Sequence, residues 1–190
     1  MPRLLLILSV TTGLVDAVSV LGLGKVFIAN MTGNIVFLAF AVAGEPGFHA
    51  ASYLAAISLF LTGALAAGRV GKANAGQPLR QWLVRAAVIE AGLLWAAAFA
   101  AHGFDVSSQS PSARLFIIIA LTALAMGFRN ATIRQLKVPD LTTTVLTLTL
   151  TGLAADSHIA GGANPNWARR IAAVVAIFAG ALLGAELVTQ

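Results

Sequence analysis

The chain has 190 residues, of which 58% are hydrophobic and only 10% are charged, and its mean hydropathy is +0.88. A soluble domain carries about 25% charged residues, so this composition excludes a water-exposed surface over most of the molecule and is typical of a protein that faces a lipid bilayer. The net charge is +5, but the twelve Lys and Arg residues are scattered among loops. This scatter excludes a nucleic-acid partner.

Seven apolar segments predict an all-α fold, a polytopic bundle of six to seven transmembrane helical segments. They cover residues 4–23, 27–43, 50–70, 82–101, 113–131, 141–155 and 167–188. About 20 apolar residues span the roughly 30 Å hydrocarbon core. No segment alternates with period two, which excludes a β-barrel. The first apolar run continues past Ala17 to Leu23, so it is expected to be a span and not a signal peptide.

Two of these segments are too short or too polar for ordinary spans. Segment 27–43 is interrupted by Asn30, Thr32, Gly33 and Asn34, and segment 141–155 is the shortest. Fifteen helical residues rise about 22 Å, less than the roughly 30 Å hydrocarbon core. Both segments are therefore predicted to be short or broken helices.

Three matches of residue order indicate an internal repeat. They are Gly13 to Ala17 with Gly127 to Ala131 at an offset of 114, Thr32 to Asn34 with Thr147 to Thr149 at 115, and Gly63 to Leu65 with Gly180 to Leu182 at 117. Their shared order and slowly growing offset predict a duplication within a single membrane domain, residues 1–190. Its parts would be a first repeat (1–71), a linker helix (80–101) and a second repeat (112–190).

Two topologies follow from this pattern, and both stay open. If the short segments span fully, there are seven spans and the repeats are parallel. If they enter and return, there are five full spans and the repeats are inverted. The seven-span topology places eight basic residues inside, whereas the re-entrant topology places ten inside and only Lys25 and Arg114 outside. The charge bias favours the re-entrant topology, and hydropathy favours seven segments.

The repeated motifs resemble those of a bacterial membrane-protein family. The stretches are Gly13 to Ala17 with Phe27 to Asn34, and Met126 to Ala131 with Thr143 to Thr151. They are similar to the YoaK-like family, a domain of unknown function, over essentially the whole chain, and Ala29 to Asn34 is the most specific part. Arg129 stands where the family usually has Gln, and Leu148 where it usually has Gly. The resemblance implies a multi-span inner-membrane protein, without an established activity, and a shared site altered in the second half.

The start of the second segment is the first candidate for a solute path. A broken helix must satisfy its freed backbone groups, so Asn30, Thr32 and Asn34 are expected to cap it while Gly33 allows an unusual backbone angle. The positive end of the helix dipole would then face a solute. A purely structural helix cap is the alternative.

The second candidate is a hydroxyl stripe in the sixth segment. Thr144, Thr147 and Thr151 share one face at helical spacing, with Leu148 beside them. This stripe would coordinate a solute or ion. Alternatively, its hydroxyls bond back to their own helix and pack closely against neighbours.

Ionisable residues inside the apolar segments are the third group. A carboxylate at membrane depth is costly unless paired, protonated or hydrated, so Asp16 is a candidate for proton coupling or for a structural pair with Arg129. The repeat places Asp16 opposite Asn130, next to Arg129. Glu90 is a further candidate, and Arg85 is poorly placed to pair with it because it lies five residues earlier.

Other motifs indicate packing and exclude chemistry. Gly180 and Gly184 have the spacing that allows close helix approach, within the chain or in a homodimer. There is no cysteine, no phosphate loop and no paired histidine spacing. We therefore expect no enzyme, no cofactor and no metal. The predicted function is passage of a small solute or ion across a bacterial inner membrane between the two halves. The alternatives are a non-transporting scaffold or accessory subunit and, after that, a membrane-embedded enzyme.

Overall fold

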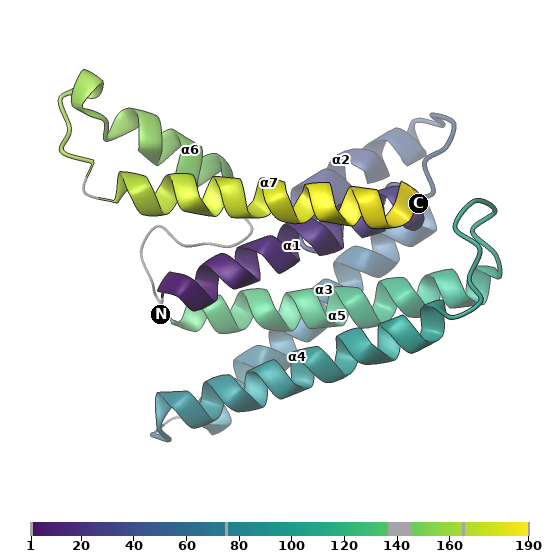
Figure 1. Ribbon diagram of the computed structural model, residues 1–190. Helices are drawn as coiled ribbons and strands as arrows, with labels where there is room; N and C mark the ends of the chain where they lie inside the picture. Colours follow the sequence, from purple (N-terminus) through teal and green to yellow (C-terminus); the bar gives the residue numbers. More distant parts are fainter. Residues whose placement is uncertain (1, 75, 137–145, 165, 190) are drawn as a thin grey trace. The chain divides into compact units, whose positions relative to one another are not determined.

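A computed structural model describes residues 2–74, 76–136, 146–164 and 166–189. These residues form seven α-helices and one 3-10 turn, and no strand (Figure 1). The helices are α1 (Pro2–Gly22), α2 (Met31–Val42), α3 (Ala50–Ala73), α4 (Leu79–Ala101), α5 (Ser112–Gln135), α6 (Leu146–Ala155) and α7 (Trp167–Thr189), with the 3-10 turn η1 at His158–Ala160. Helices α3, α4, α5 and α7 are long and apolar enough to cross a bilayer, and α2 and α6 are short. The predicted polytopic helical bundle is confirmed.

The chain divides into two compact units. Unit 1 comprises residues 1–18 and 137–190, and unit 2 comprises residues 19–136. The division falls inside α1, which is one continuous helix. The units therefore do not follow the predicted repeats, because each draws helices from both halves of the chain.

Unit 2 is built on α5, which is buried between α3 and α4. Its inner residues Ile119, Ala123 and Met126 are fully buried. Helices α3 and α5 cross at two glycines: a Cβ built on Gly63 would lie 2.2 Å from the Leu124 carbonyl oxygen, and one on Gly127 would lie 2.0 Å from the Phe60 carbonyl oxygen. Glycine is therefore required at both positions, because only hydrogen leaves room for the facing backbone.

In unit 1, α1 and α7 cross in the same way. A Cβ built on Gly13 would lie 2.1 Å from the Ile177 carbonyl oxygen, and one on Gly180 would lie 1.9 Å from the Val10 carbonyl oxygen. Gly184 also faces α1, at the carbonyl of Leu14. The close approach that the sequence predicts for Gly180 and Gly184 thus lies within the chain, the first of its two alternatives.

Helix α2 returns to the end of unit 2 from which the chain left α1. Lys25, just after α1, lies with its Nζ 4.4 Å from the centroid of the Phe48 ring, in the loop after α2. Gln109, in the loop after α4, lies against Gly24. We call this the Lys25 end, and the end with the α3–α4 turn the Pro78 end. The loops that follow α1, α2 and α4 therefore share one end, and α2 does not cross to the other.

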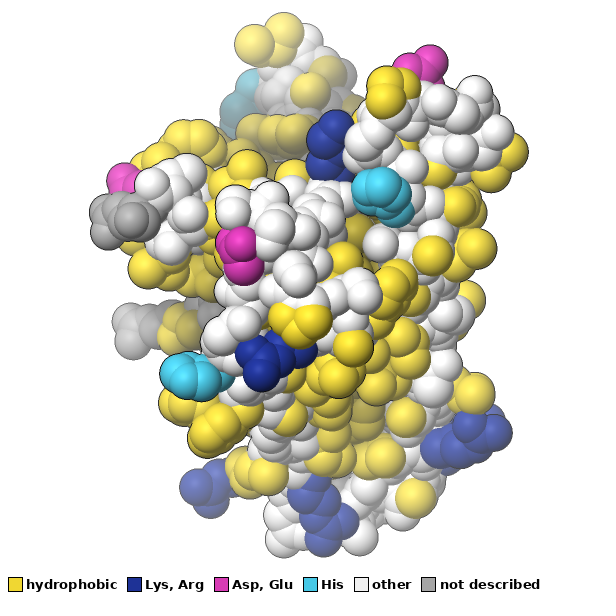
Figure 2. All heavy atoms as spheres, turned by 90° about the vertical axis from the view of Figure 1, so that its right-hand side faces the viewer, with side chains coloured by type: hydrophobic (Ala, Val, Ile, Leu, Met, Phe, Trp, Pro, Cys, Tyr) yellow, Lys and Arg dark blue, Asp and Glu magenta, His cyan; other side chains and the backbone are white. Residues whose placement is uncertain are grey.

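The outer faces of the helices are apolar. Val88 and Trp95 of α4 and Phe178 of α7 are about two-thirds exposed. Figure 2, viewed from the right-hand side of Figure 1, shows hydrophobic side chains at the surface between separate groups of charged and histidine side chains. Such a surface is stable in contact with hydrocarbon and not with water, so the protein crosses the membrane several times.

Candidate functional site

The segment between α1 and α2 is closed by one buried amide. Asn34 has no exposed surface, and its Oδ1 accepts the Phe27 N–H at 2.8 Å while its Nδ2 donates to the Phe27 carbonyl at 2.5 Å. Both backbone groups of Phe27 are thereby satisfied in a place where an unpaired group would be costly. Asn34 thus fixes where the incoming chain meets the first turn of α2, in place of a helix cap.

The other predicted residues of this motif act differently from expectation. Gly33 lies within α2 and has no positive φ, so the expected unusual backbone angle is wrong. A Cβ there would lie 2.5 Å from the Phe27 ring, and Gly33 provides space for that ring. Asn30 occupies the N-cap position but its side chain makes no capping hydrogen bond. Asn30 and Thr32 are exposed, which leaves the amide and hydroxyl groups at the start of α2 open to a ligand.

An aromatic cluster fixes the rest of α2. The Phe37 ring lies 5.8 Å from that of Phe27, 5.3 Å from that of Phe48 and 5.9 Å from that of Tyr53, centroid to centroid. Tyr53 lies at the beginning of α3 and is fully buried. Aromatic pairs at such distances stabilise a fold by about 0.5–1.5 kcal/mol each beyond their buried area. The cluster therefore secures α2 between its incoming segment and α3.

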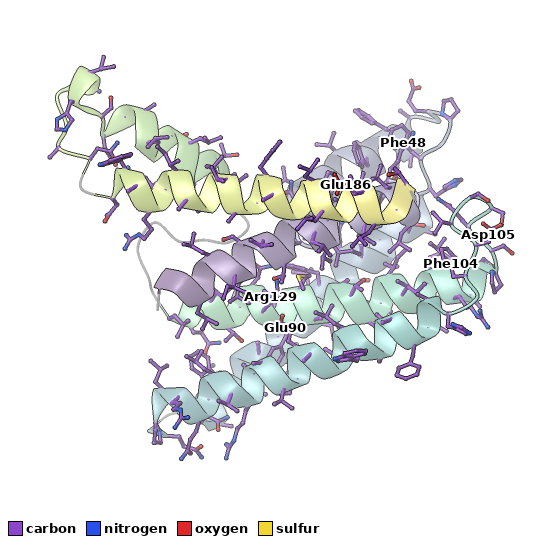
Figure 3. The ribbon with its side chains drawn as sticks, viewed as in Figure 1. Phe48, Glu90, Phe104, Asp105, Arg129 and Glu186 are labelled. Atoms are coloured by element: carbon purple, nitrogen blue, oxygen red, sulfur yellow. The ribbon has the colours of Figure 1, made fainter. Side chains whose placement is uncertain are left out.

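Between α4 and α5 lies a buried ion pair of two predicted residues. The Arg129 Nε donates to Glu90 Oε1 at 2.8 Å, and its Nη2 bonds the same oxygen. The two side chains are 3% and 15% exposed and point toward one another (Figure 3). Glu90 is the central residue of α4, about 16 Å of helix from either end. The pair therefore places two opposite charges within the hydrocarbon layer, where charges occur at functional or pairing sites.

Asp16 and Asn130 remain candidates from opposite units. Asp16 is half-buried in α1, in unit 1. Asn130 is half-buried in α5, and its Nδ2 donates to the Met126 carbonyl at 2.9 Å, one turn back along the same helix. That bond satisfies part of the amide within α5 itself.

The hydroxyl stripe of α6 lies differently from the predicted one. Thr144 lies outside the described residues. Thr147 and Thr151 are exposed, and the buried threonine is Thr149, which is 5% exposed. The hydroxyl that packs into unit 1 therefore comes from the other face of the helix, while Thr147 and Thr151 keep their hydroxyls outward.

The end of α6 is held by Arg170, a residue that the sequence did not indicate. Its Nη1 donates to the Gly152 carbonyl at 2.6 Å, and its Nη2 lies 2.7 Å from the Asp156 carboxylate. Asn164 adds a bond from its Nδ2 to the Leu153 carbonyl at 3.1 Å. These side chains satisfy carbonyls that the last turn of a helix leaves unpaired. Their signal was the cluster of Asp, Asn and Arg residues between two apolar segments.

On the Lys25 end, the α4–α5 loop carries one ionised carboxylate, Asp105. Hydrogen bonds from the hydroxyl of Ser108 and from the hydroxyl and N–H of Ser107 lower the pKa of Asp105 to about 2. Its negative charge is therefore present throughout the physiological range. Its position contrasts with the Arg and Lys residues at the Pro78 end.

The long apolar helices and the charges paired between two of them define a multi-pass α-helical membrane protein. The chain belongs to the family described as "Protein of unknown function (DUF1275)", which matches residues 4–190. It is 35% identical over 155 residues to the "UPF0700 transmembrane protein YoaK" of Bacillus subtilis (strain 168), a match that covers 80% of this chain and 65% of that protein. The resemblance predicted from the sequence is confirmed. No solved structure matches the chain.

Proposed function

We propose that this protein carries a small solute or ion across the bacterial inner membrane, without enzymatic chemistry, along a path that includes the start of α2. The proposal is carried by the shortness of α2 and by the position of its C-terminal end among the loops, from which we infer that α2 begins inside the membrane. Its 12 residues rise about 18 Å, and its C-terminal end lies at the Lys25 end, among the loops. The start of α2 is then near the middle of the roughly 30 Å hydrocarbon core.

A helix that begins at this depth is typical of transporters. The first N–H groups of α2 have no partner earlier in the helix, and they carry the positive end of its dipole. Transporters of several folds place such half-helix ends against an anionic or electronegative group of the solute. Exposed Asn30 and Thr32 at this point supply further polar contacts.

Two helix crossings support the predicted repeat. In unit 1, Gly13 meets the carbonyl three residues before Gly180, and Gly180 meets the carbonyl three residues before Gly13. In unit 2, Gly127 and Gly63 do the same with Phe60 and Leu124. Under the sequence offsets of 114 and 117, Gly13 is equivalent to Gly127, and Gly63 is equivalent to Gly180. A duplication explains why the same contact geometry occurs twice. In each crossing, the first helix of one half (α1 or α5) meets the third helix of the other half (α7 or α3).

A third contact follows the same offsets. Phe37 of α2 packs on Tyr53 of α3, and the offsets of 115 and 117 convert this pair into Gly152 and Arg170. Arg170 contacts Gly152 in unit 1. The short helix of each half is thus held to its following long helix at equivalent positions by different chemistry, an aromatic contact in the first half and a charged one in the second.

The two crossing helices run in the same direction in each unit. Paired residues increase together along both crossings, Val10 with Gly180 and Leu14 with Gly184 in one, and Gly63 with Leu124 and Gly71 with Gln135 in the other, so each pair is parallel.

Counting crossings along the chain gives the membrane sides. Because α2 returns to the Lys25 side, α3 starts on that side and crosses to the Pro78 side. Helix α4 then crosses back to the Lys25 side, and α5 starts there and crosses to the Pro78 side. Helix α7 runs parallel to α1 and starts next to the end of α6. We infer inverted halves, because a returning α2 followed by full crossings of α3 and α4 brings α5 into the membrane from the side opposite to that of α1. Among the described Lys and Arg residues of unit 2, only Lys25 and Arg114 fall on the Lys25 side, so we infer from the positive-inside rule that the Pro78 side is cytoplasmic.

A flux measurement tests the transport proposal. The protein is reconstituted in liposomes, and entry of a panel of small anions, zwitterions and cations is followed with and without protein. We expect protein-dependent flux of at least one solute, slowed about tenfold by Thr32→Val, the effect of one lost hydrogen bond of roughly 1.4 kcal/mol. Thr62→Val is the matched control, because Thr62 in α3 is exposed and bonds only its own helix at the Ser58 carbonyl.

The same assay distinguishes the alternatives. Absence of flux across the whole panel in well-folded protein contradicts transport and favours a scaffold or accessory subunit. If Thr32→Val and Thr62→Val slow the flux equally, the start of α2 is not part of the path. If Asp16 couples the flux to protons, Asp16→Asn abolishes its pH dependence, and an unchanged pH profile excludes that role.

A further inference from the structure

The Pro78 end of unit 2 carries uncompensated positive charge. Five cations lie there: Arg69, Lys72, Arg80, Arg85 and Arg134. Residues 69–85 contain no Asp or Glu, and none of the five forms an ion pair in the part of the chain that the structure describes. A concentration of unpaired cations at one end of a membrane protein attracts anions at that surface.

Two of these arginines face a hollow at the start of α4. It has a volume of about 270 Å³ and is lined by Arg80, Gln81, Val84 and Arg85, which share one helical face. The Arg85 Nη1 bonds the side-chain oxygen of Asn74 and, at 3.0 Å, that of Gln77. Both partners are neutral amides from the α3–α4 turn. They hold the guanidinium in place without cancelling its charge, so the charge remains available to an anion.

The hollow continues into an apolar surface. Val84 is 54% exposed and Val88, one turn further along α4, is 66% exposed. Both lie on the outer face of a helix of which only 11% of the membrane-spanning part is buried. A ligand at this position contacts cations at one end and apolar side chains along its length. A phospholipid, with an anionic headgroup and apolar acyl chains, matches this arrangement.

We propose that this hollow binds the headgroup phosphate of an anionic phospholipid from the cytoplasmic leaflet, with Arg80 and Arg85 on the phosphate and an acyl chain along Val84 and Val88. Free phosphate would contact only the two arginines and not the apolar surface of Val84 and Val88. The anionic lipids of the cytoplasmic leaflet supply the complementary charge at the correct side and depth. The choice of the cytoplasmic leaflet rests on the membrane orientation proposed above, whereas the binding itself does not depend on transport.

Lipid binding to the full chain is the test. The protein in phosphatidylcholine nanodiscs receives increasing phosphatidylglycerol, and retained lipid is counted by native mass spectrometry after release. We expect selective retention of phosphatidylglycerol, with affinity reduced about 30-fold in the double variant Arg80→Gln, Arg85→Gln, from two cations near the surface. The control removes the same charge at the same end with Arg69→Gln and Lys72→Gln, and retains the affinity within about threefold.

Three results would overturn the proposal. Equal loss in both double variants indicates a diffuse charge effect without a site. Equal retention of phosphatidylcholine excludes selection for anionic lipid. Displacement of the lipid by millimolar inorganic phosphate with unchanged thermal stability shows that a free anion suffices. Arg80→Gln alone serves as a second variant, because Arg80 is exposed and its loss removes no protein contact, and we expect it to lower the affinity about fivefold.

Discussion

At the scale of single residues, this protein uses polar side chains to satisfy backbone or charge that lipid cannot solvate. Asn34 holds both backbone groups of Phe27, and Arg170 holds the last carbonyls of α6. The carboxylate of Glu90 does the same for the guanidinium of Arg129. Each arrangement supplies the hydrogen bonds that water would provide in solution and that lipid cannot provide. These residues therefore determine where the chain is able to break a helix or bury a charge.

The Glu90–Arg129 pair yields a quantitative prediction. We expect Glu90→Gln to lower the free energy of unfolding by about 3–5 kcal/mol, because it removes a carboxylate that directly bonds a guanidinium of 3% exposure. The double variant Glu90→Gln, Arg129→Gln should recover more than half of that loss, since no charge then remains buried. Reversible unfolding in mixed detergent of the wild type, the single variants Glu90→Gln and Arg129→Gln, and the double variant gives the coupling energy between the two side chains.

The matched control for the pair is Arg134→Gln. Arg134 lies five residues later in α5 but is exposed at the Pro78 end, so its replacement should change stability by no more than about 0.5 kcal/mol. Additive losses in the double variant would show that Glu90 and Arg129 act independently and that the pair does not stabilise the spans.

At the scale of helices, the closest contacts are made by backbone on backbone. Association of spans in lipid gains little from the hydrophobic effect, because lipid tails are as apolar as the helices. Close approach at glycine provides the van der Waals contact instead. Of the glycines in α3, Gly63 faces the Leu124 carbonyl, whereas Gly68 has nothing within 4 Å of a built Cβ.

This difference predicts opposite effects of one substitution within one helix. Gly63→Ala should destabilise the protein by about 1–3 kcal/mol, because the facing atom is backbone and cannot move aside as a side chain does. Gly68→Ala should be neutral or stabilise by up to about 1 kcal/mol, since alanine is the better helix former. Thermal unfolding of both variants measures the difference, and equal melting temperatures would contradict the contact.

Sequence reasoning located the helices better than it located their partners. Lipid enforces long apolar runs, so the segments were evident, and helix boundaries differ by a few residues at most where the chain is described. The largest shifts are four residues: α5 continues to Gln135 instead of ending at Ala131, and α2 begins at Met31 and not at Phe27, because Asn34 holds Phe27 outside the helix. The pairing of Glu90 with Arg129 bridges 39 residues and depends on which helices adjoin, which no local pattern specifies.

At the scale of the whole molecule, each of the two compact units holds one short helix against a long one, α2 against α3 and α6 against α7. Lys25 beside Phe48 places the segments before and after α2 at the same end of unit 2, and Arg170 beside Asp156 holds the end of α6 at the start of α7. The crossings of α1 with α7 and of α3 with α5 are each parallel. The proposed return of both short helices gives inverted halves, which in transporters alternate access to a site near the midplane.

Cysteine labelling tests this topology directly, since the chain has no cysteine of its own. We expect Lys25→Cys and Glu45→Cys to react with a membrane-impermeant maleimide from the periplasmic side, and Lys72→Cys and Ile159→Cys only after the membrane is opened. Ile159 in η1 is fully exposed, so its reactivity reports the side and not burial. Seven full spans place Lys25 opposite Glu45, and Ile159 opposite Lys72. Labelling of either pair from opposite sides would therefore exclude the returning helices, and with them the inverted halves on which the proposed path depends.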